Sequence, residues 1–226
     1  KILIVSGFLG AGKTTFIKRL ARNVDQWFAI LENEYGAAGI DGARLGQNRQ
    51  GTQKNVWEMT EQCICCIGKK DFAASVLTIA NVVDPEYLIV EPTGVGSLAR
   101  IIENLRQIEY ERIQLLSPVT IVDVYSYRRY MAEYPELYQD QIRSADTIIV
   151  SKTEACQAEE KQRIQKFLQE INPQAKIITD YASTMTWEDY QSLLLGGRYE
   201  KEVQDTQSGE NMPETFSFEN MRMEAP

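Results

Sequence analysis

The stretch ILIVSGFLGAGKTTFIKRL (residues 2–20) joins an apolar run, a glycine-rich turn and a segment with helical spacing. Within it, GFLGAGKT (7–14) satisfies the pattern G-x-x-x-x-G-K-[ST], whose backbone N–H groups surround a phosphate at the start of a helix. A chance glycine turn is the competing interpretation, and the order strand, motif, helix argues against it. The motif predicts a P-loop whose nucleotide contacts come from Gly7, Gly10, Ala11, Gly12, Lys13, Thr14 and Thr15, with the Thr14 hydroxyl ligating Mg²⁺.

Apolar runs without polar alternation recur at 27–31, 87–90, 119–122, 147–150 and 176–179, and a shorter one lies at 55–59. Such runs are typical of parallel strands covered on both faces. Between them, apolar residues follow helical spacing in 98–108 and 164–171. Alternation of strand and helix predicts an α/β fold, a doubly wound, mostly parallel sheet in a three-layer P-loop NTPase.

The composition excludes several classes of protein. Asp and Glu number 32 against 24 Lys and Arg, giving a net charge of −8, and the basic residues are scattered, which argues against nucleic-acid binding. No apolar run approaches the roughly 20 residues of a membrane span, and no signal-peptide pattern opens the chain. We therefore expect a cytoplasmic protein with no membrane partner. One P-loop domain is expected over 1–192, followed by a linker or tail over 193–226, in which TFSF (215–218) favours a solitary edge strand.

A second acidic group normally holds the magnesium ion of a P-loop through water, at the end of a neighbouring strand. Glu91, in LIVEPTG (88–94), is the candidate, and Gly94 lies where a backbone N–H could meet the γ-phosphate. The competing interpretation is a carboxylate that merely ends a strand. The paired glycine favours the nucleotide role, so that Lys13 and Glu91 are predicted to act in catalysis.

The base is predicted to be guanine, because one carboxylate can accept both of its N1 and N2 donors. SKTE (151–154) follows an apolar run and resembles the N-K-x-D guanine reader of GTPases, with Ser151 shorter than Asn and Glu154 longer than Asp. Lys152 would lie against the purine, and Tyr181 and Ala182 would complete the base pocket. A polar loop after a strand is the alternative.

Three thiols lie within CICC (63–66), and the chain contains no His. Thiolates suit Zn²⁺, Cu(I) and similar ions, and three of them need a fourth donor from Cys156, a carboxylate, water or a partner. Buried cysteines that pack as small apolar side chains are one alternative. Redox chemistry is the other, since Lys69 and Lys70 would lower the thiol pKa values.

Taken in order, GFLGAGKTT (7–15), ENEYG (32–36) with Ile40 and Asp41, CICC and EPTG (91–94) resemble the CobW/HypB/UreG GTPases, specifically the CobW-like metallochaperones of the SIMIBI class. The resemblance covers about residues 1–180, and it implies that 193–226 hold the truncated start of a C-terminal domain. It implies a metal site formed by Glu32, Cys63, Cys65 and Cys66. It also implies that Asp41, in the first switch loop, positions water or Mg²⁺ during catalysis.

Two departures from the family pattern concern the metal site. Ala37 replaces an acid that relatives often carry directly after ENEYG, and Gln62 replaces the glycine before the first cysteine. We therefore expect metal affinity or selectivity to differ from that of relatives.

The resemblance implies a GTP-hydrolysing metallochaperone that couples Mg²⁺GTP to a thiophilic metal, zinc as the first expectation and cobalt as the second. Unaided turnover is expected to be slow, roughly 10⁻⁴ to 10⁻² s⁻¹. The expected partner is a client metalloprotein or metal-cofactor enzyme, and a homodimer stays open. The rivals are a P-loop ATPase or kinase, a non-catalytic nucleotide-binding metal or redox sensor, and a cofactor-loading chaperone for a corrinoid or nickel enzyme.

Overall fold

The structure is a computed structural model and describes residues 1–32, 56–60 and 69–200. Its described strands form one seven-stranded sheet in the order β3-β2-β4-β1-β5-β6-β7, and every neighbouring pair is parallel. This confirms the predicted α/β fold. The strands are β1 (Ile2–Gly7), β2 (Phe28–Glu32), β3 (Val56–Thr60), β4 (Tyr87–Glu91), β5 (Val119–Asp123), β6 (Thr147–Ser151) and β7 (Lys176–Ile178).

The central strands are buried along their whole length, which explains their unbroken apolar runs. Every residue of β1, β4, β5 and β6 is buried, whereas β7, at one edge, is only partly covered. β1 pairs with β4 on one side and β5 on the other, so both of its neighbours come from distant parts of the chain. The chain order thus changes direction around β1, and ligands of open α/β sheets bind at the carboxyl ends of strands at such a point.

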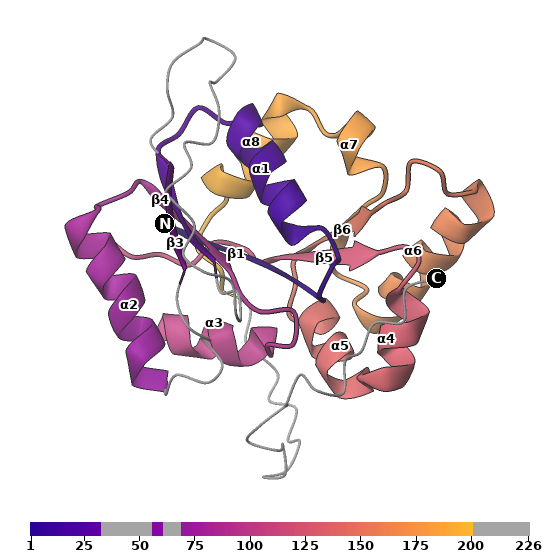
Figure 1. The fold of residues 1–226 in the computed structure, drawn as a ribbon, viewed down its shortest axis with the longest axis horizontal. Helices are drawn as coiled ribbons and strands as arrows, with labels where there is room; N and C mark the ends of the chain where they lie inside the picture. Colours follow the sequence, from indigo (N-terminus) through magenta and orange to yellow (C-terminus); the bar gives the residue numbers. More distant parts are fainter. Residues whose placement is uncertain (33–55, 61–68, 201–226) are drawn as a thin grey trace.

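Helices cover both faces of the sheet (Figure 1). One face packs against α1 (Lys13–Asn23), α7 (Tyr181–Thr184) and α8 (Trp187–Leu195). The other packs against α3 (Leu98–Arg106), α4 (Tyr127–Glu133), α5 (Pro135–Arg143) and α6 (Ala158–Ile171), together with α2 (Lys69–Val82). The two cores are separated by the sheet, which produces the predicted three layers.

Residues 193–200, which the sequence assigns to the tail, pack against the domain. Leu194, the second-last residue of α8, is fully buried, and Tyr199 is only 3% exposed. The Tyr199 backbone N–H donates to the Leu115 carbonyl at 2.8 Å, and Arg198 forms an ion pair with Glu109 at 3.1 Å. Within 193–200, Leu194 and Tyr199 thus pack with the domain, whereas Leu195 is 56% exposed. The segment 215–218 lies outside the described residues.

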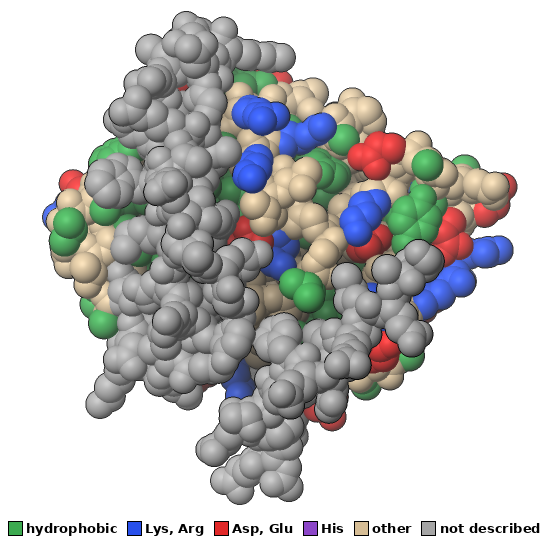
Figure 2. Space-filling model, in the orientation of Figure 1, with side chains coloured by type: hydrophobic (Ala, Val, Ile, Leu, Met, Phe, Trp, Pro, Cys, Tyr) green, Lys and Arg blue, Asp and Glu red, His purple; other side chains and the backbone are tan. Residues whose placement is uncertain are grey.

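Among the described helices, none combines the length and the apolar composition that crossing a bilayer requires. The visible face of the molecule carries basic side chains over α1 and acidic side chains beside them (Figure 2). Charges of both signs are therefore interspersed on the described part of this face.

Candidate functional site

The glycine-rich turn after β1 requires backbone conformations that side chains rarely allow. Gly7 has φ +142°, and a Cβ there would lie 2.4 Å from the Ile121 carbonyl oxygen. Gly12 has φ +98° and begins α1, without a side chain that caps the helix. The first N–H groups of an α-helix have no acceptor within the helix, and this 11-residue helix begins directly after the turn, which is the arrangement that binds phosphate.

Lys13, Thr14 and Glu91 lie together at the carboxyl edge of the sheet. The Thr14 hydroxyl donates to the two Glu91 carboxylate oxygens at 3.0 and 3.1 Å, and the Lys13 ammonium lies 4.0 Å from the same carboxylate. Lys13 also donates to the Phe8 carbonyl at 3.4 Å. Lys13 and Glu91 are both buried, at 7% and 9% exposure. A hydroxyl beside a buried carboxylate is a hard-oxygen donor pair that suits Mg²⁺, so these residues fit the predicted ion.

The segment after β4 lies directly against the P-loop. A Cβ on Gly94 would lie 2.3 Å from the Leu9 nitrogen and 2.9 Å from the Leu9 Cα. Only glycine allows this approach. Gly94 and the P-loop are therefore brought together, as the sequence predicts.

The predicted base-reading residues follow β6 and β7, which are neighbouring parallel strands. The Ser151 hydroxyl donates to the Ala11 carbonyl at 2.6 Å, so this segment is tied to the P-loop. Lys152 has φ +60° and is exposed, as is Glu154. The Lys152 ammonium forms an ion pair with Asp123 at 2.8 Å.

Asp180, Tyr181 and Ala182 form the second half of this region. The Tyr181 ring packs edge-on against Phe16 at 5.7 Å, and Arg19 donates to the Ala182 carbonyl. Hydrogen bonds from Lys161 and then from Thr153 lower the pKa of Asp180. Thr153, in the loop after β6, therefore influences the Asp180 carboxylate after β7.

Two contributors to this site were missed by the sequence reasoning. Asp123 ends β5 and also accepts from the Tyr125 N–H and the Ser126 hydroxyl, both at 2.9 Å. Its signal was available, because TIVD (120–123) repeats the strand-then-acid pattern of LIVE (88–91). The Tyr130 hydroxyl donates to the Leu9 carbonyl at 3.0 Å, a contact that no local pattern signals.

Aromatic side chains of α4 and α5 pack against Phe8 of the P-loop. Phe8 lies with its ring centroid 4.5 Å from that of Tyr130 and 5.2 Å from that of Tyr138. Tyr130 lies on α4 and Tyr138 on α5, so these two helices hold Phe8, the second residue of the P-loop motif, in place.

Of the residues predicted to bind the thiophilic metal, only Glu32 lies within the described residues. Its Cα is paired with Glu91 of β4 and with Thr60 of β3. Asp41, Cys63, Cys65 and Cys66 lie outside the described residues. Within 1–32, 56–60 and 69–200, no group of three or more His, Cys, Asp or Glu residues could hold a metal ion.

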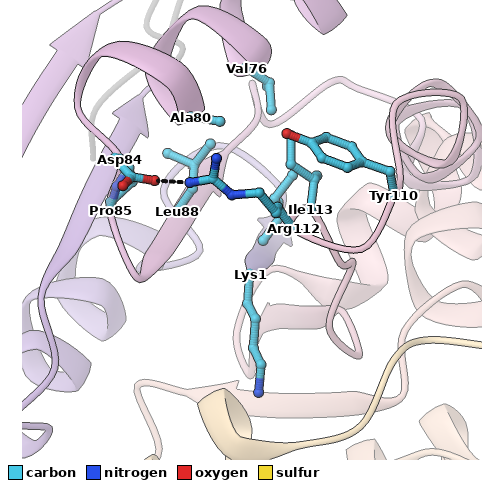
Figure 3. Close-up of a pocket in the computed structure, with 10 residues that line it drawn as sticks. Lys1, Val76, Ala80, Asp84, Pro85, Leu88, Tyr110, Arg112 and Ile113 are labelled. Carbon is cyan, nitrogen blue, oxygen red and sulfur yellow. Dashed lines mark hydrogen bonds and ion pairs between the residues drawn. The ribbon is translucent and has the colours of Figure 1, made fainter.

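A small cavity of about 40 Å³ lies at the opposite end of the sheet, between α2 and the starts of β1 and β4 (Figure 3). Its rim carries an ion pair between Asp84 and Arg112 at 3.0 Å. Because Ile2 opens β1 and Leu88 is the second residue of β4, this cavity lies at the other end of these strands from the P-loop and plays no part in the site described above.

A family model described as "CobW/HypB/UreG, nucleotide-binding domain" matches residues 1–179. The zinc chaperone YeiR of Escherichia coli is 30% identical over 178 residues, which cover 77% of this chain and 53% of that protein. The zinc chaperone CobW of Pseudomonas aeruginosa is 27% identical over 192 residues, covering 72% and 51%. This chain thus spans about half the length of the curated relatives it matches.

Solved structures share the fold. The Zn(II)-bound YjiA GTPase from E. coli aligns with a TM-score of 0.63 at 23% identity, covering 96% of this chain and 66% of that one. The nickel complex of HypB from Helicobacter pylori aligns with a TM-score of 0.55 at 18% identity, covering 85% and 81%. At these identities the alignments establish the architecture alone.

Proposed function

The chain belongs to the CobW/HypB/UreG family, and on that premise we propose that it is a GTP-binding and GTP-hydrolysing metallochaperone. Its cargo is a thiophilic metal, zinc in the first place and cobalt in the second. The relatives YeiR and CobW are both named zinc chaperones, which supports this choice of metal. The receiving partner is a client metalloprotein or metal-cofactor enzyme.

Nucleotide binding is supported by the P-loop geometry. The N–H groups at the start of α1 and the Lys13 ammonium supply positive charge where the phosphates would lie. Thr14 and Glu91 would hold Mg²⁺, which neutralises charge on the β- and γ-phosphates when it is bound. Ser151, Lys152 and Glu154 would read guanine, with Tyr181 and Ala182 closing the pocket.

Hydrolysis requires an oriented water molecule and stabilisation of the charge that develops on the γ-phosphate. Lys13 would stabilise the charge on the γ-phosphate, and Gly94 lies close enough to Leu9 to present its N–H to the same phosphate. From the family resemblance, Asp41 would orient the water or the Mg²⁺ ion. We expect turnover to be slow, about 10⁻⁴ to 10⁻² s⁻¹, until a partner adds positive charge.

The single observation that carries the coupling of nucleotide to cargo is the pairing of Glu32 with Glu91. Neighbouring strands lie about 4.8 Å apart. Glu32, the proposed cargo ligand, and Glu91, the proposed magnesium ligand, therefore end adjacent strands at the carboxyl edge of the sheet. On its other side, Glu32 pairs with Thr60, three residues before Cys63. If the bound nucleotide moves the end of β4, the paired end of β2 would therefore move with it. This would change the positions of Glu32 and of the thiols Cys63, Cys65 and Cys66, which would bind the metal.

The test is a titration of the reduced protein with Zn²⁺ and with Co²⁺, in the presence of Mg²⁺GDP or of Mg²⁺ with a non-hydrolysable GTP analogue. We expect metal affinity to differ between the two states by at least about fivefold, the lower end of typical coupling. The double variant Cys65→Ser/Cys66→Ser should lose the tight site. Cys156→Ser is the matched control and should keep it. Equal affinities in both nucleotide states would end the coupling, even if GTP hydrolysis persisted.

A further inference from the structure

Gln141 of α5 contacts the segment after β4 at two points. Its side-chain amide donates to the Gly94 carbonyl at 3.1 Å and to the Gly96 carbonyl at 2.9 Å. Both partners are acceptors, so the NH₂ end of the side chain must face them, and both of its hydrogens are used. Gln141 is only 1% exposed, which shields these bonds from competition with water.

The segment that Gln141 holds is the one that contacts the P-loop. Gly94 lies against Leu9 so closely that a Cβ would overlap the Leu9 backbone. The turn is closed by a hydrogen bond from the Gly96 N–H to the Thr93 carbonyl at 3.0 Å. A displacement of Gly94 by a fraction of an ångström would therefore change the space and the N–H groups that the γ-phosphate meets.

Hydrogen bonds beside Gln141 hold its helix in place. The Thr120 hydroxyl of β5 donates to the Gln141 carbonyl at 2.9 Å, so the helix is tied to the sheet. One residue earlier, the buried Asp140 carboxylate accepts from the Leu98 N–H at 2.7 Å and from the Ala99 N–H at 3.4 Å. Asp140 and Gln141 together thus hold the segment from Gly94 to the start of α3.

The oxygen of the Gln141 side-chain amide lowers the stability of the fold. Its Oε1 is buried and makes no hydrogen bond within the described part of the chain. A buried acceptor without a partner destabilises the fold, so an apolar side chain would suit this position better if it served packing alone. The donor function of the amide is what distinguishes Gln141 from such a residue.

We propose that Gln141 is a positioning residue that holds the Gly94–Gly96 segment where it senses the γ-phosphate, and so sets the preference for GTP over GDP. The inference rests on the proposed GTP binding and adds to it a residue outside the P-loop and the base pocket. Gln141 acts through Gly94 and Gly96 and does not touch the nucleotide.

The experiment compares the unaltered protein with Gln141→Leu, which keeps a similar volume and removes both donors. Affinities are measured for fluorescent GDP and for a fluorescent non-hydrolysable GTP analogue, both with Mg²⁺. We expect the ratio of GTP to GDP affinity to fall about tenfold, the effect of losing roughly two modest hydrogen bonds. Gln139→Leu is the matched control, because Gln139 lies on the same helix and pairs with Arg143 instead.

A second variant covers the case in which Gln141→Leu does not fold. In Gln141→Glu, the carboxyl group donates one hydrogen bond when protonated and repels both carbonyls when ionised. The affinity ratio should therefore recover as the pH is lowered, a response that general loss of packing would not give. An unchanged ratio, or equal losses for GTP and GDP, would overturn the inference. If the unaltered protein binds neither nucleotide, the proposed function itself fails.

Discussion

The Thr14 hydroxyl lies 3.0 Å from the Glu91 carboxylate, although the two residues are 77 positions apart in the chain. The contact joins the first helical turn after the P-loop to the end of the next strand in the sheet. It places two oxygen donors side by side within reach of the Lys13 ammonium. Several measurable consequences follow from this arrangement and from the contacts around it.

Glu91→Gln removes the negative charge and keeps the shape. Because Glu91 would hold Mg²⁺ from the outer shell, we expect GTP hydrolysis to slow and the Mg²⁺ requirement to rise, by about 10- to 100-fold. Steady-state hydrolysis measured against Mg²⁺ concentration checks this. Glu133→Gln, an exposed carboxylate on α4, serves as the control. An unshifted Mg²⁺ dependence would show that Glu91 only ends its strand.

Glu154→Gln keeps one acceptor and loses the charge that would accept both guanine donors. Hydrogen bonds to charged groups are worth about 1.5–3 kcal/mol, so GDP affinity should fall about tenfold or more. Displacement of fluorescent GDP by GDP, IDP and ADP measures the effect. The unaltered protein should prefer GDP over IDP, which lacks the 2-amino group. If ADP competes equally with GDP before any substitution, the guanine assignment is wrong.

Tyr130→Phe removes the hydrogen bond to Leu9 and leaves the ring against Phe8. We expect the free energy of unfolding to fall by about 1 kcal/mol, because the Leu9 carbonyl loses its partner in a partly buried contact. Urea unfolding measures this change. Tyr125→Phe is the matched control, since Tyr125 is 61% exposed and its substitution should have an effect within about 0.5 kcal/mol. Equal effects for the two variants would mean that the Leu9 contact does not stabilise the fold.

Asp180 should make stability depend on acid pH. Its pKa is lowered from about 3.8 by hydrogen bonds from Lys161 and Thr153, so the folded state favours the ionised form. This contribution is present above the ordinary pKa and is lost as the pH falls through the lowered, folded-state value. Asp180→Asn should flatten the acid limb of the stability curve, and Asn tolerates the φ of +54° found there.

The partner residue offers a direct check on Asp180. In Lys161→Met, the pKa of the Asp180 carboxyl should rise toward its ordinary value, which carbon NMR of the carboxyl group can follow. A pKa that does not move would show that the 2.6 Å ion pair is not responsible for the shift.

The strands were predictable because burial on both faces leaves a signal that needs no partner. The run at 119–122 became β5, and even the short run at 55–59 became β3. The helix α3 was also predictable, because its buried residues recur at helical spacing and lie along one side of the helix. In α5 the buried side includes Tyr138, Asp140 and Gln141, and this polar content hides the helical period.

Parts of the site were predictable because a motif fixes local geometry. Lys13, Thr14 and Gly94 were assigned from patterns in which the backbone itself forms the site, and the structure brings them together. Asp123 carries a strand-then-acid signal in the sequence, but its ion pair with Lys152 joins residues distant in the chain, as does the contact of Tyr130 with Leu9. Only the assembled sheet reveals these two contacts. The guanine and metal assignments stay predictions.

The pairing of β1 with β4 and β5 also bears on how the chain matures during synthesis. A ribosome releases the first strand long before either neighbour emerges, since those strands begin at Tyr87 and Val119. Until then the nascent chain presents Ile2, Leu3 and Ile4 without hydrogen-bonding partners, a condition that favours aggregation and recruits holding chaperones. The phosphate turn therefore takes shape only after more than half of these 226 residues have been made.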